Sequence, residues 1–351
     1  MGFLKQLRAL ILSGLPALTH IWKTNSRSQH DNEEVINFQS LTELRLSDLP
    51  RFTGITKNAS KASERLPEDS SPEQPDVIIQ YSLFDTKVHF PVLTKLYIEF
   101  VNVEEIWNNQ LSAESFCELR ILRVGECYKL LHLVPTHMQN RLQKLEYIEV
   151  FCCSSLKEIF EFRRLIGDDE WDATTISESG DQGAQINKMM SFKQSRQAFQ
   201  NLGVILIWRC HGLRTLLSPS VARGLVKLQI LTIGECSIKE VVVAAAAEGE
   251  ETEDDNMFSQ LHTLVLENLR NLGSFSEGKY NFKWPQVKKI KILRCNNMER
   301  FCLGSLSTPK EVEIEVEGAG VSVLQELNDS RQEIWEWKRA AFGTSLCNCS
   351  L

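Results

Sequence analysis

The chain has 351 residues, of which 42% are hydrophobic and 24% are charged, so it can bury a large core and is not disordered as a whole. Its formal net charge of -7 argues against a protein whose main partner is nucleic acid, because phosphate backbones attract basic surfaces. The sequence contains no run of about 20 apolar residues that would span a bilayer as a helix. Composition therefore predicts a globular protein with neither nucleic-acid nor membrane partners.

The first residues of the chain have two interpretations. Lys5 and Arg8 precede an apolar stretch at residues 9–18, which is an arrangement typical of a secretory leader. Ser13, Gly14 and Pro16 interrupt that stretch. The leucines of the same segment also fit a pattern that recurs along the whole chain, and we therefore favour a structural repeat over a leader.

That pattern is L-x-x-L-x-L-x-x-(L/C)-x-x-L. Its first three apolar positions are filled by Leu7/Leu10/Leu12, Leu41/Leu44/Leu46, Leu93/Leu96/Ile98, Leu119/Leu122/Val124, Leu145/Ile148/Val150, Leu202/Ile205/Ile207, Leu228/Leu231/Ile233, Leu261/Leu264/Leu266 and Val287/Ile290/Ile292. A tenth unit, Val312/Ile314/Val316, is degenerate. Successive units begin 34, 52, 26, 26, 57, 26, 33 and 26 residues apart. The recurring interval of 26 lies within the period of leucine-rich repeats.

The pattern predicts a short strand in each unit, because alternate residues of a strand point to the same side. One unit cannot bury its apolar side alone, so neighbouring units must stack. We therefore expect an α/β leucine-rich-repeat solenoid over residues 1–317. It would be a curved horseshoe of about ten repeats, with short parallel strands on the concave face and irregular turns and short helices on the convex face. Ser218-Pro219 predicts the start of one such helix, and residues 136–145 predict another.

Two columns of side chains accompany the strands. An aromatic residue lies three positions upstream of most units, and we expect it to pack in a second apolar layer. These residues are Phe38, Phe90, Phe116, Phe199, Phe258 and Trp284. Cysteine occupies the ninth position of five units, at Cys127, Cys153, Cys210, Cys236 and Cys295. Buried free thiols are the favoured interpretation, although neighbouring strands would bring Cys127 and Cys153 within reach of a disulfide.

Three polar stretches interrupt the repeat and predict loop insertions, near residues 54–89, 162–198 and 244–257. The third holds six carboxylates between Glu248 and Asp255, which form either a solvated loop or an attractive surface for cations or a basic partner. Residues 318–351 are expected to form a helical cap and a tail. The apolar residues of that cap would be Leu324, Leu327, Ile334, Trp335 and Trp337.

The sequence contains no recognisable catalytic, metal or cofactor motif. The segment 273–280 matches seven positions of a phosphate-binding loop, but Tyr280 stands where a serine or threonine would hold magnesium. The seven histidines form no metal-ligand motif, and Cys347 and Cys349 have no partners at zinc-finger spacing. We therefore predict neither an enzyme nor a metal, nucleotide or cofactor site.

Outward-facing residues of the strands are the candidate site, because curved solenoids bind on the concave face. Aromatic and arginine side chains there are of the type that dominates binding energy at protein interfaces. The candidates are Tyr97, Phe100, Arg123, Glu149, Phe151, Trp208, Arg209, Lys291 and Arg294. The alternative for Phe100, Phe151 and Trp208 is packing against neighbouring strands or an insertion.

Several segments resemble the C-terminal leucine-rich repeats of plant coiled-coil nucleotide-binding disease-resistance receptors. They are F-Q-N-L at 199–202, W-R-C-H-G-L-R at 208–214, L-S-P-S-V-A at 217–222, L-V-K-L at 225–228, I-G-E-C at 233–236 and K-E-V-V at 239–242. The resemblance covers nearly all of the chain outside the insertions. The sequence differs from complete receptors because it shows neither a coiled coil nor a nucleotide-binding switch domain. The resemblance therefore does not imply ATP binding or signalling.

The resemblance implies a cytoplasmic protein-binding module in the defence response. Its partners would be a pathogen effector, a guarded host protein or a receptor switch domain. The alternative is the substrate-recognition region of an F-box ubiquitin-ligase adaptor, a class that also uses 26-residue repeats with cysteine after the strand. An F-box helix would have to precede the repeats, which here begin by Leu7.

Overall fold

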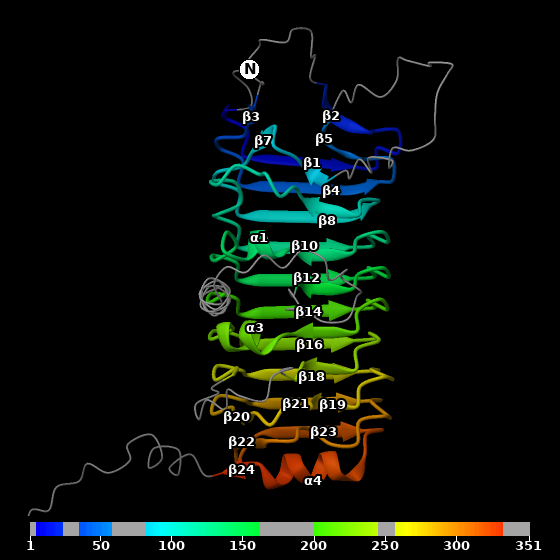
Figure 1. Cartoon of the computed structure of the whole chain (residues 1–351), viewed down its shortest axis with the longest axis vertical. Helices are drawn as coiled ribbons and strands as arrows, with labels where there is room; N and C mark the ends of the chain where they lie inside the picture. Colours follow the sequence, from blue (N-terminus) through cyan, green and yellow to red (C-terminus); the bar gives the residue numbers. More distant parts are fainter. Residues whose placement is uncertain (1–4, 24–34, 58–81, 162–198, 245–256, 333–351) are drawn as a thin grey trace, which may run out of the picture.

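The computed structural model describes residues 5–23, 35–57, 82–161, 199–244 and 257–332. Ten parallel strands, one from each unit, stack in chain order into a single sheet (Figure 1). The strands are β1 (Ala9–Ser13), β4 (Glu43–Leu49), β8 (Lys95–Val101), β10 (Ile121–Gly125), β12 (Tyr147–Phe151), β14 (Val204–Trp208), β16 (Ile230–Gly234), β18 (Thr263–Glu267), β21 (Lys289–Leu293) and β23 (Glu313–Glu317). The predicted leucine-rich-repeat solenoid is thus confirmed.

Burial alternates along each strand as the leucine pattern predicts. In β8, for example, Leu96 and Ile98 are fully buried, whereas Lys95 and Tyr97, which alternate with them, are only half-buried. Each strand is in register with the next, so that Leu96 pairs with Leu44 on one side and with Leu122 on the other. The fourth and sixth positions of the repeats thus form continuous apolar rows on the inner side of the sheet.

A second series of short parallel strands lies on the other side of the core, where the sequence predicted only turns and short helices. The pairs are β2 (His20–Lys23) with β5 (Gly54–Lys57), β3 (Ile36–Asn37) with β7 (Val88–His89), β6 (Ser82–Phe84) with β9 (Glu105–Trp107), and β11 (His132–Val134) with β13 (Glu158–Phe160). Two groups of three are β15 (Thr215–Leu217), β17 (Glu240–Val242) and β19 (Ser274–Ser276), and β20 (Asn281–Lys283), β22 (Ser305–Pro309) and β24 (Arg331–Gln332). These strands are only two to five residues long, and their patterns are too short to be read as strands from sequence.

Three helices complete the described structure. They are α1 (Thr136–Gln139), α3 (Pro219–Gly224) and α4 (Val321–Asp329). The predicted start of α3 is confirmed, because Ser218 Oγ accepts a hydrogen bond from the Val221 amide at 3.2 Å and Pro219 is in the first turn. The helix predicted at 136–145 is a single turn and ends at Gln139. None of these helices is long and apolar enough to cross a membrane.

The aromatic column packs as predicted, with all six residues at most 2% exposed. Phe38 and Phe90 stack with ring centroids 4.9 Å apart, and Phe116 lies 5.3 Å beyond Phe90. Farther along the chain, Phe258 and Trp284 join a cluster around Phe275. These rings form an aromatic layer between the two series of strands.

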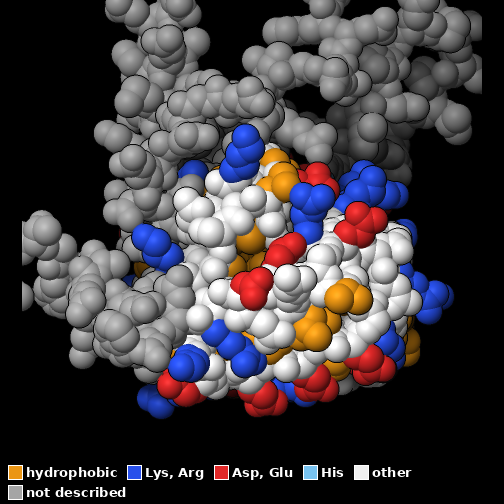
Figure 2. Space-filling view, turned by 90° about the horizontal axis from the view of Figure 1, so that it is seen from below, with side chains coloured by type: hydrophobic (Ala, Val, Ile, Leu, Met, Phe, Trp, Pro, Cys, Tyr) orange, Lys and Arg blue, Asp and Glu red, His pale blue; other side chains and the backbone are white. Residues whose placement is uncertain are grey.

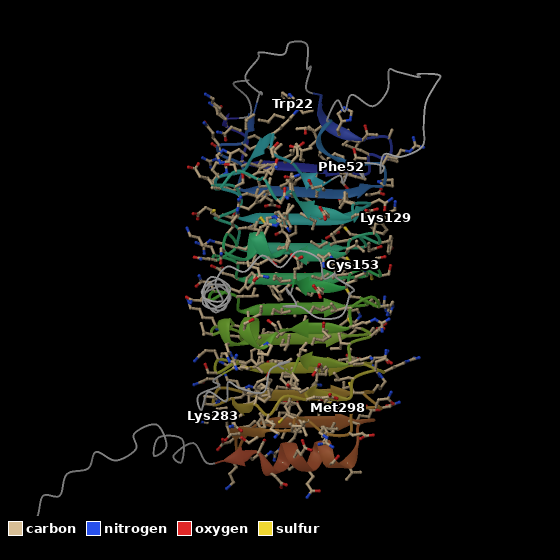
Figure 3. The ribbon with its side chains drawn as sticks, in the orientation of Figure 1. Trp22, Phe52, Lys129, Cys153, Lys283 and Met298 are labelled. Atoms are coloured by element: carbon tan, nitrogen blue, oxygen red, sulfur yellow. The ribbon has the colours of Figure 1, made fainter. Side chains whose placement is uncertain are left out.

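The five cysteines at the ninth position are buried and free, so the disulfide alternative for Cys127 and Cys153 is wrong. Each thiol donates to the backbone oxygen two residues before it, as Cys127 does to Gly125 at 3.3 Å and Cys236 does to Gly234 at 3.2 Å. Figure 3 shows Cys153 on the same stack of repeats. The thiol is small and is a weak donor, and it therefore satisfies a turning backbone without occupying much of the core.

The backbone turns sharply at the eighth position, at the C-terminal end of every strand of the ten-stranded sheet. The residue there has a positive φ in all ten units. These residues are Gly14, Asp48, Phe100, Glu126, Cys152, Arg209, Glu235, Asn268, Arg294 and Gly318. Only two of them are glycine, the residue that adopts this conformation without strain, so the stacking of repeats imposes the turn on whichever residue is present.

The insertion predicted near 54–89 is too wide. Its first and last residues form β5, β6 and β7, with Ile55, Leu83 and Val88 buried. The leucine pattern is interrupted there because residues 58–81 separate two short strands, β5 and β6. Those residues lie outside the described structure, as do the second insertion and the acidic segment between Glu248 and Asp255.

The two ends of the sheet are built differently. Beyond β23, α4 buries Val323 and Leu327 against the last repeats, while Leu324, which we had expected inside, is 40% exposed. Glu326 fixes the helix by accepting the amide of Phe301 at 2.7 Å. Seen from this end, most of the described surface is backbone and uncharged polar side chains, with charged side chains scattered over it and small hydrophobic patches (Figure 2). Residues Ile334, Trp335 and Trp337 lie outside the described residues.

Side chains of neighbouring repeats also pair, and several of these pairs are 26 residues apart in the sequence. Lys144 Nζ lies 2.6 Å from Glu118 Oε1, and Lys227 Nζ lies 2.7 Å from Asn201 Oδ1. Arg120 contacts Glu146 in the same way. These pairs join one repeat to the next outside the core.

Candidate protein-binding face

The outward side chains of the ten-stranded sheet, together with the turn residues at the ends of its strands, form one surface, which we call the sheet face. All nine predicted residues lie on it, in three rows. Tyr97, Arg123, Glu149 and Lys291 are in the fifth-position row, Phe151 and Trp208 are in the seventh, and Phe100, Arg209 and Arg294 are in the eighth. Strand register brings Tyr97, Arg123 and Glu149 together, whereas Lys291 and Arg294 lie four strands farther along the sheet.

Arg123 organises the part of the sheet face over β8, β10 and β12. Its Nε lies 3.1 Å from Glu99 Oε1, and one terminal nitrogen lies 3.6 Å from Glu149 Oε2. Its guanidinium carbon also lies 4.9 Å from the centre of the Phe151 ring. Contacts with the two neighbouring strands, β8 and β12, therefore hold this cation in place, which orders the surface before any partner arrives.

Two tyrosines extend this arrangement. Tyr97 lies under the guanidinium of Arg45, with 4.4 Å between the guanidinium carbon and the ring centre. Tyr147 donates its hydroxyl to Glu149 at 2.9 Å. Burial, followed by this hydrogen bond to a carboxylate, raises the pKa of Tyr147 to about 12. The phenol is thus a hydrogen-bond donor at neutral pH.

Phe151 and Trp208 both pack on the sheet and border open surface. A methyl group added to Gly125 would meet the tip of the Phe151 ring at 2.0 Å, and one added to Gly234 would meet the Trp208 ring at 2.0 Å. Each ring therefore lies over a glycine of an adjacent strand, Phe151 toward β10 and Trp208 toward β16. Both side chains remain half-buried. One side of each ring therefore packs on a neighbouring strand, as in the alternative interpretation, and the other side is accessible.

The remaining predicted cations are each paired with a carboxylate on a neighbouring strand. Arg209 Nε lies 3.1 Å from Glu235 Oε2, and this hydrogen bond raises the pKa of Arg209. Lys291 pairs with Glu315, whose hydrogen bond raises the pKa of Lys291. Arg294 pairs with Glu267 in the same way. Such exposed pairs contribute little to stability, but they fix the charge pattern of the face.

An apolar strip over β14, β16 and β18 was not among the predicted sites. Its members point outward and are only partly buried. They are Val204, Leu206, Ile230, Thr232, Thr263 and Val265. Because aromatic and charged residues dominate binding energy at interfaces, the sequence prediction did not include these four aliphatic residues and two threonines. The signal was present, because a strand buried on one side only should alternate with polar residues, and V-I-L-I-W does not.

Two observations in the described structure concern the nucleotide and metal motifs considered in the sequence. Residues 273–280 run through β19 toward β20, with Tyr280 buried, whereas a phosphate-binding loop must join a strand to a helix. Among the described residues, no three histidine, cysteine or acidic side chains are arranged to hold a metal ion.

Comparison with known proteins matches residues 92–237 and 191–308 to the family model of plant disease resistance protein RPS2-like leucine-rich repeats. The two overlapping segments together cover well over half of the 351 residues. They run from β8 into β22 and so include the apolar strip and all nine predicted residues, but not β1 or β4. No curated protein sequence matches the chain significantly.

Proposed function

Because this chain belongs to the leucine-rich-repeat family of RPS2-like plant disease resistance proteins, we propose that its sheet face binds a protein in the plant defence response. The partner would be a pathogen effector, a guarded host protein or the switch domain of a receptor. The module binds and does not catalyse.

The observation that carries this proposal is the apolar strip beside Trp208. Leu206 and Val265 face outward from a sheet whose other side already supplies the core. The flanking cations are held by carboxylates, as Arg123 is by Glu149 on one side and Lys291 is by Glu315 on the other. An apolar centre within a polar, ordered rim is the usual anatomy of a protein interface.

We also place the protein in the cytoplasm. The eight cysteines of the described residues are all free, and an oxidising compartment favours disulfides. Buried thiols that donate to backbone oxygens, such as Cys236, suit a reducing environment.

Affinity capture from plant tissue, with and without pathogen challenge, tests the proposal. The bait would be the full chain, compared with a Trp208→Ala/Arg209→Ala variant and a Leu206→Glu variant. Lys283→Ala is the matched control, because Lys283 is exposed on β20, away from the ten-stranded sheet (Figure 3). We expect a pathogen protein or a receptor switch domain with the wild type and the control, and its loss with both face variants.

A thermal melt of each variant separates loss of binding from loss of folding. Capture of a ubiquitin-ligase scaffold subunit, in place of a defence protein, would replace the proposal with the F-box adaptor alternative. Equal capture by Leu206→Glu and by the wild type would remove the apolar strip from the binding face.

A further inference from the structure

Three adjacent strands end in an acidic, an aromatic and an acidic residue. Asp48 of β4, Phe100 of β8 and Glu126 follow the same register, and each has a φ of 53°. Tyr128 lies two residues after Glu126. We call these four residues the aromatic–acidic rim. Figure 3 shows the neighbouring Lys129 at the edge of the molecule where the strands end.

Phe100 is an unfavourable residue for the positive-φ turn that the stack of repeats imposes at this position. A bulky residue with positive φ is strained, and the ring is 46% exposed. Phe116, Phe199 and Phe258 also have positive φ, but each is fully buried, so burial of the ring offsets the strain there. Phe100 gains no such burial. Strain retained on an exposed aromatic residue points to a binding role.

The two rings of the rim are arranged as a pair. Phe100 and Tyr128 meet edge to face, with centroids 6.4 Å apart and planes at 79°. Tyr128 is itself 49% exposed and donates its hydroxyl to Glu126 Oε2 at 3.1 Å. That hydrogen bond ties the aromatic pair to a carboxylate, so ring faces and negative charge are presented together.

The charge of the rim also sets it apart from the rest of the eighth-position row. Farther along, Arg209 is neutralised by Glu235, and Arg294 by Glu267. Asp48 and Glu126 form no ion pair with any residue that the structure describes. Exposed aromatic faces between two unneutralised carboxylates attract a cation, and a planar guanidinium both stacks on a ring and pairs with a carboxylate.

We propose that the aromatic–acidic rim binds an arginine side chain of the partner protein. This inference rests on the proposed function, because it assumes that the sheet face has a protein partner. It adds the chemistry of one contact, a guanidinium stacked on Phe100 or Tyr128 and paired with Asp48 or Glu126.

The test uses three labelled peptides of otherwise identical glycine–serine sequence, carrying three arginines, three lysines or three citrullines. Binding to the full chain is measured by fluorescence polarisation at several salt concentrations. We expect the arginine peptide to bind more tightly than the lysine peptide and the citrulline peptide to bind least. Citrulline keeps the shape of arginine without its charge.

Two substitutions in the chain locate the binding. Phe100→Asn leaves the charge unchanged and should weaken arginine-peptide binding at least fivefold, and Glu126→Gln should do the same. Glu317→Gln is the matched control, since it removes a carboxylate from the exposed end of β23 at the far end of the sheet, and its effect should stay within twofold. Phe100→Asn should also melt at the same or a higher temperature, because asparagine tolerates positive φ.

Unchanged arginine-peptide binding in Phe100→Asn would overturn the inference. An equal loss in Glu317→Gln would also overturn it, because the binding would then be general attraction to an acidic protein. The peptide result is independent of the capture experiment, so failure of the rim and failure of the proposed function are read separately.

Discussion

The two ends of the ten-stranded sheet differ in how their outermost strands are protected. At one end, β1 has Leu10 and Leu12 only partly buried and Ile11 58% exposed, with no charged residue on the strand. At the other end, β23 carries Glu313, Glu315 and Glu317, and α4 packs beyond it. The inward residues Ile314 and Val316 of β23 are also only partly buried.

The difference shows that the stability of a strand in a solenoid depends on the strands that pack on either side of it. The leucine triplet of β1 has the same spacing as that of β16, yet Leu231 of β16 is fully buried between two strands, whereas Leu10 has a partner strand on one side. Edge strands are commonly protected by charge or by a covering helix. The described structure provides both at β23 and neither at β1.

The largest expected effect contrasts the middle of the sheet with β1. Leu231→Ala should lower the free energy of unfolding by about 3–5 kcal/mol, because a cavity opens between two repeats. Leu10→Ala should cost about 1 kcal/mol, since its side chain is already partly in water. Denaturant unfolding of both variants measures the difference. Equal losses would mean that β1 is as well packed as the centre, which would break the comparison.

The next effect concerns the helix at the other end. Leu327→Ala removes a fully buried side chain of α4 and should cost about 2–3 kcal/mol. We expect amide hydrogen exchange to accelerate in β23 and β22 and to stay unchanged in β1. Leu324→Ala, on the exposed side of the same helix, is the control. Unaltered exchange in β23 would show that α4 does not protect this end.

A smaller loss of stability, confined to the middle of the solenoid, is expected when the cap of α3 is removed. Ser218→Ala removes the side chain that caps α3 and should cost about 1 kcal/mol. Exchange should increase for amides of α3, while both ends of the sheet keep their wild-type rates. Ser218→Asp, which can still accept the Val221 amide, should retain the stability. A change at β1 or β23 would contradict the view that repeats influence only their neighbours.

The smallest effect is a pH dependence in β12, distant from both ends. The pKa of Tyr147 is about 12 in the folded chain, against 10.0 for the free side chain, so the unfolded chain loses this proton first. Stability should therefore fall as pH rises from about 10 to about 12. Comparison with Tyr147→Phe isolates this contribution, and phenolate absorbance follows the ionisation. Identical pH profiles for the two proteins would contradict the assignment.

The repeat could be predicted from sequence because its signal is long and redundant. Each inward residue, such as Ile205 or Ile290, recurs at a fixed place in a strand, and the register of one unit constrains the next. The aromatic and cysteine columns followed from the same spacing. The short strands on the other side of the core, such as β9, were not predicted, because three residues carry too little periodicity.

The candidate face could be predicted only in part. Sequence placed Tyr97, Arg123 and Glu149 on one surface, but it could not show that Trp208 leans over Gly234, because that contact depends on a residue 26 positions away. Nor did it show that Phe100 has positive φ, which the stack imposes on its turn. Aliphatic Leu206 was missed because it looks like core in a sequence.

The pairing of side chains between adjacent repeats, often 26 residues apart, has a consequence for how such a chain changes in length. Lys144 pairs with Glu118 and Arg209 with Glu235, one repeat apart in each case. Removal or duplication of one whole repeat would rewrite only the pairs at the single new junction, and every other pair would keep its partner. Gene duplication can therefore change the number of repeats while it alters side-chain pairs at only one junction.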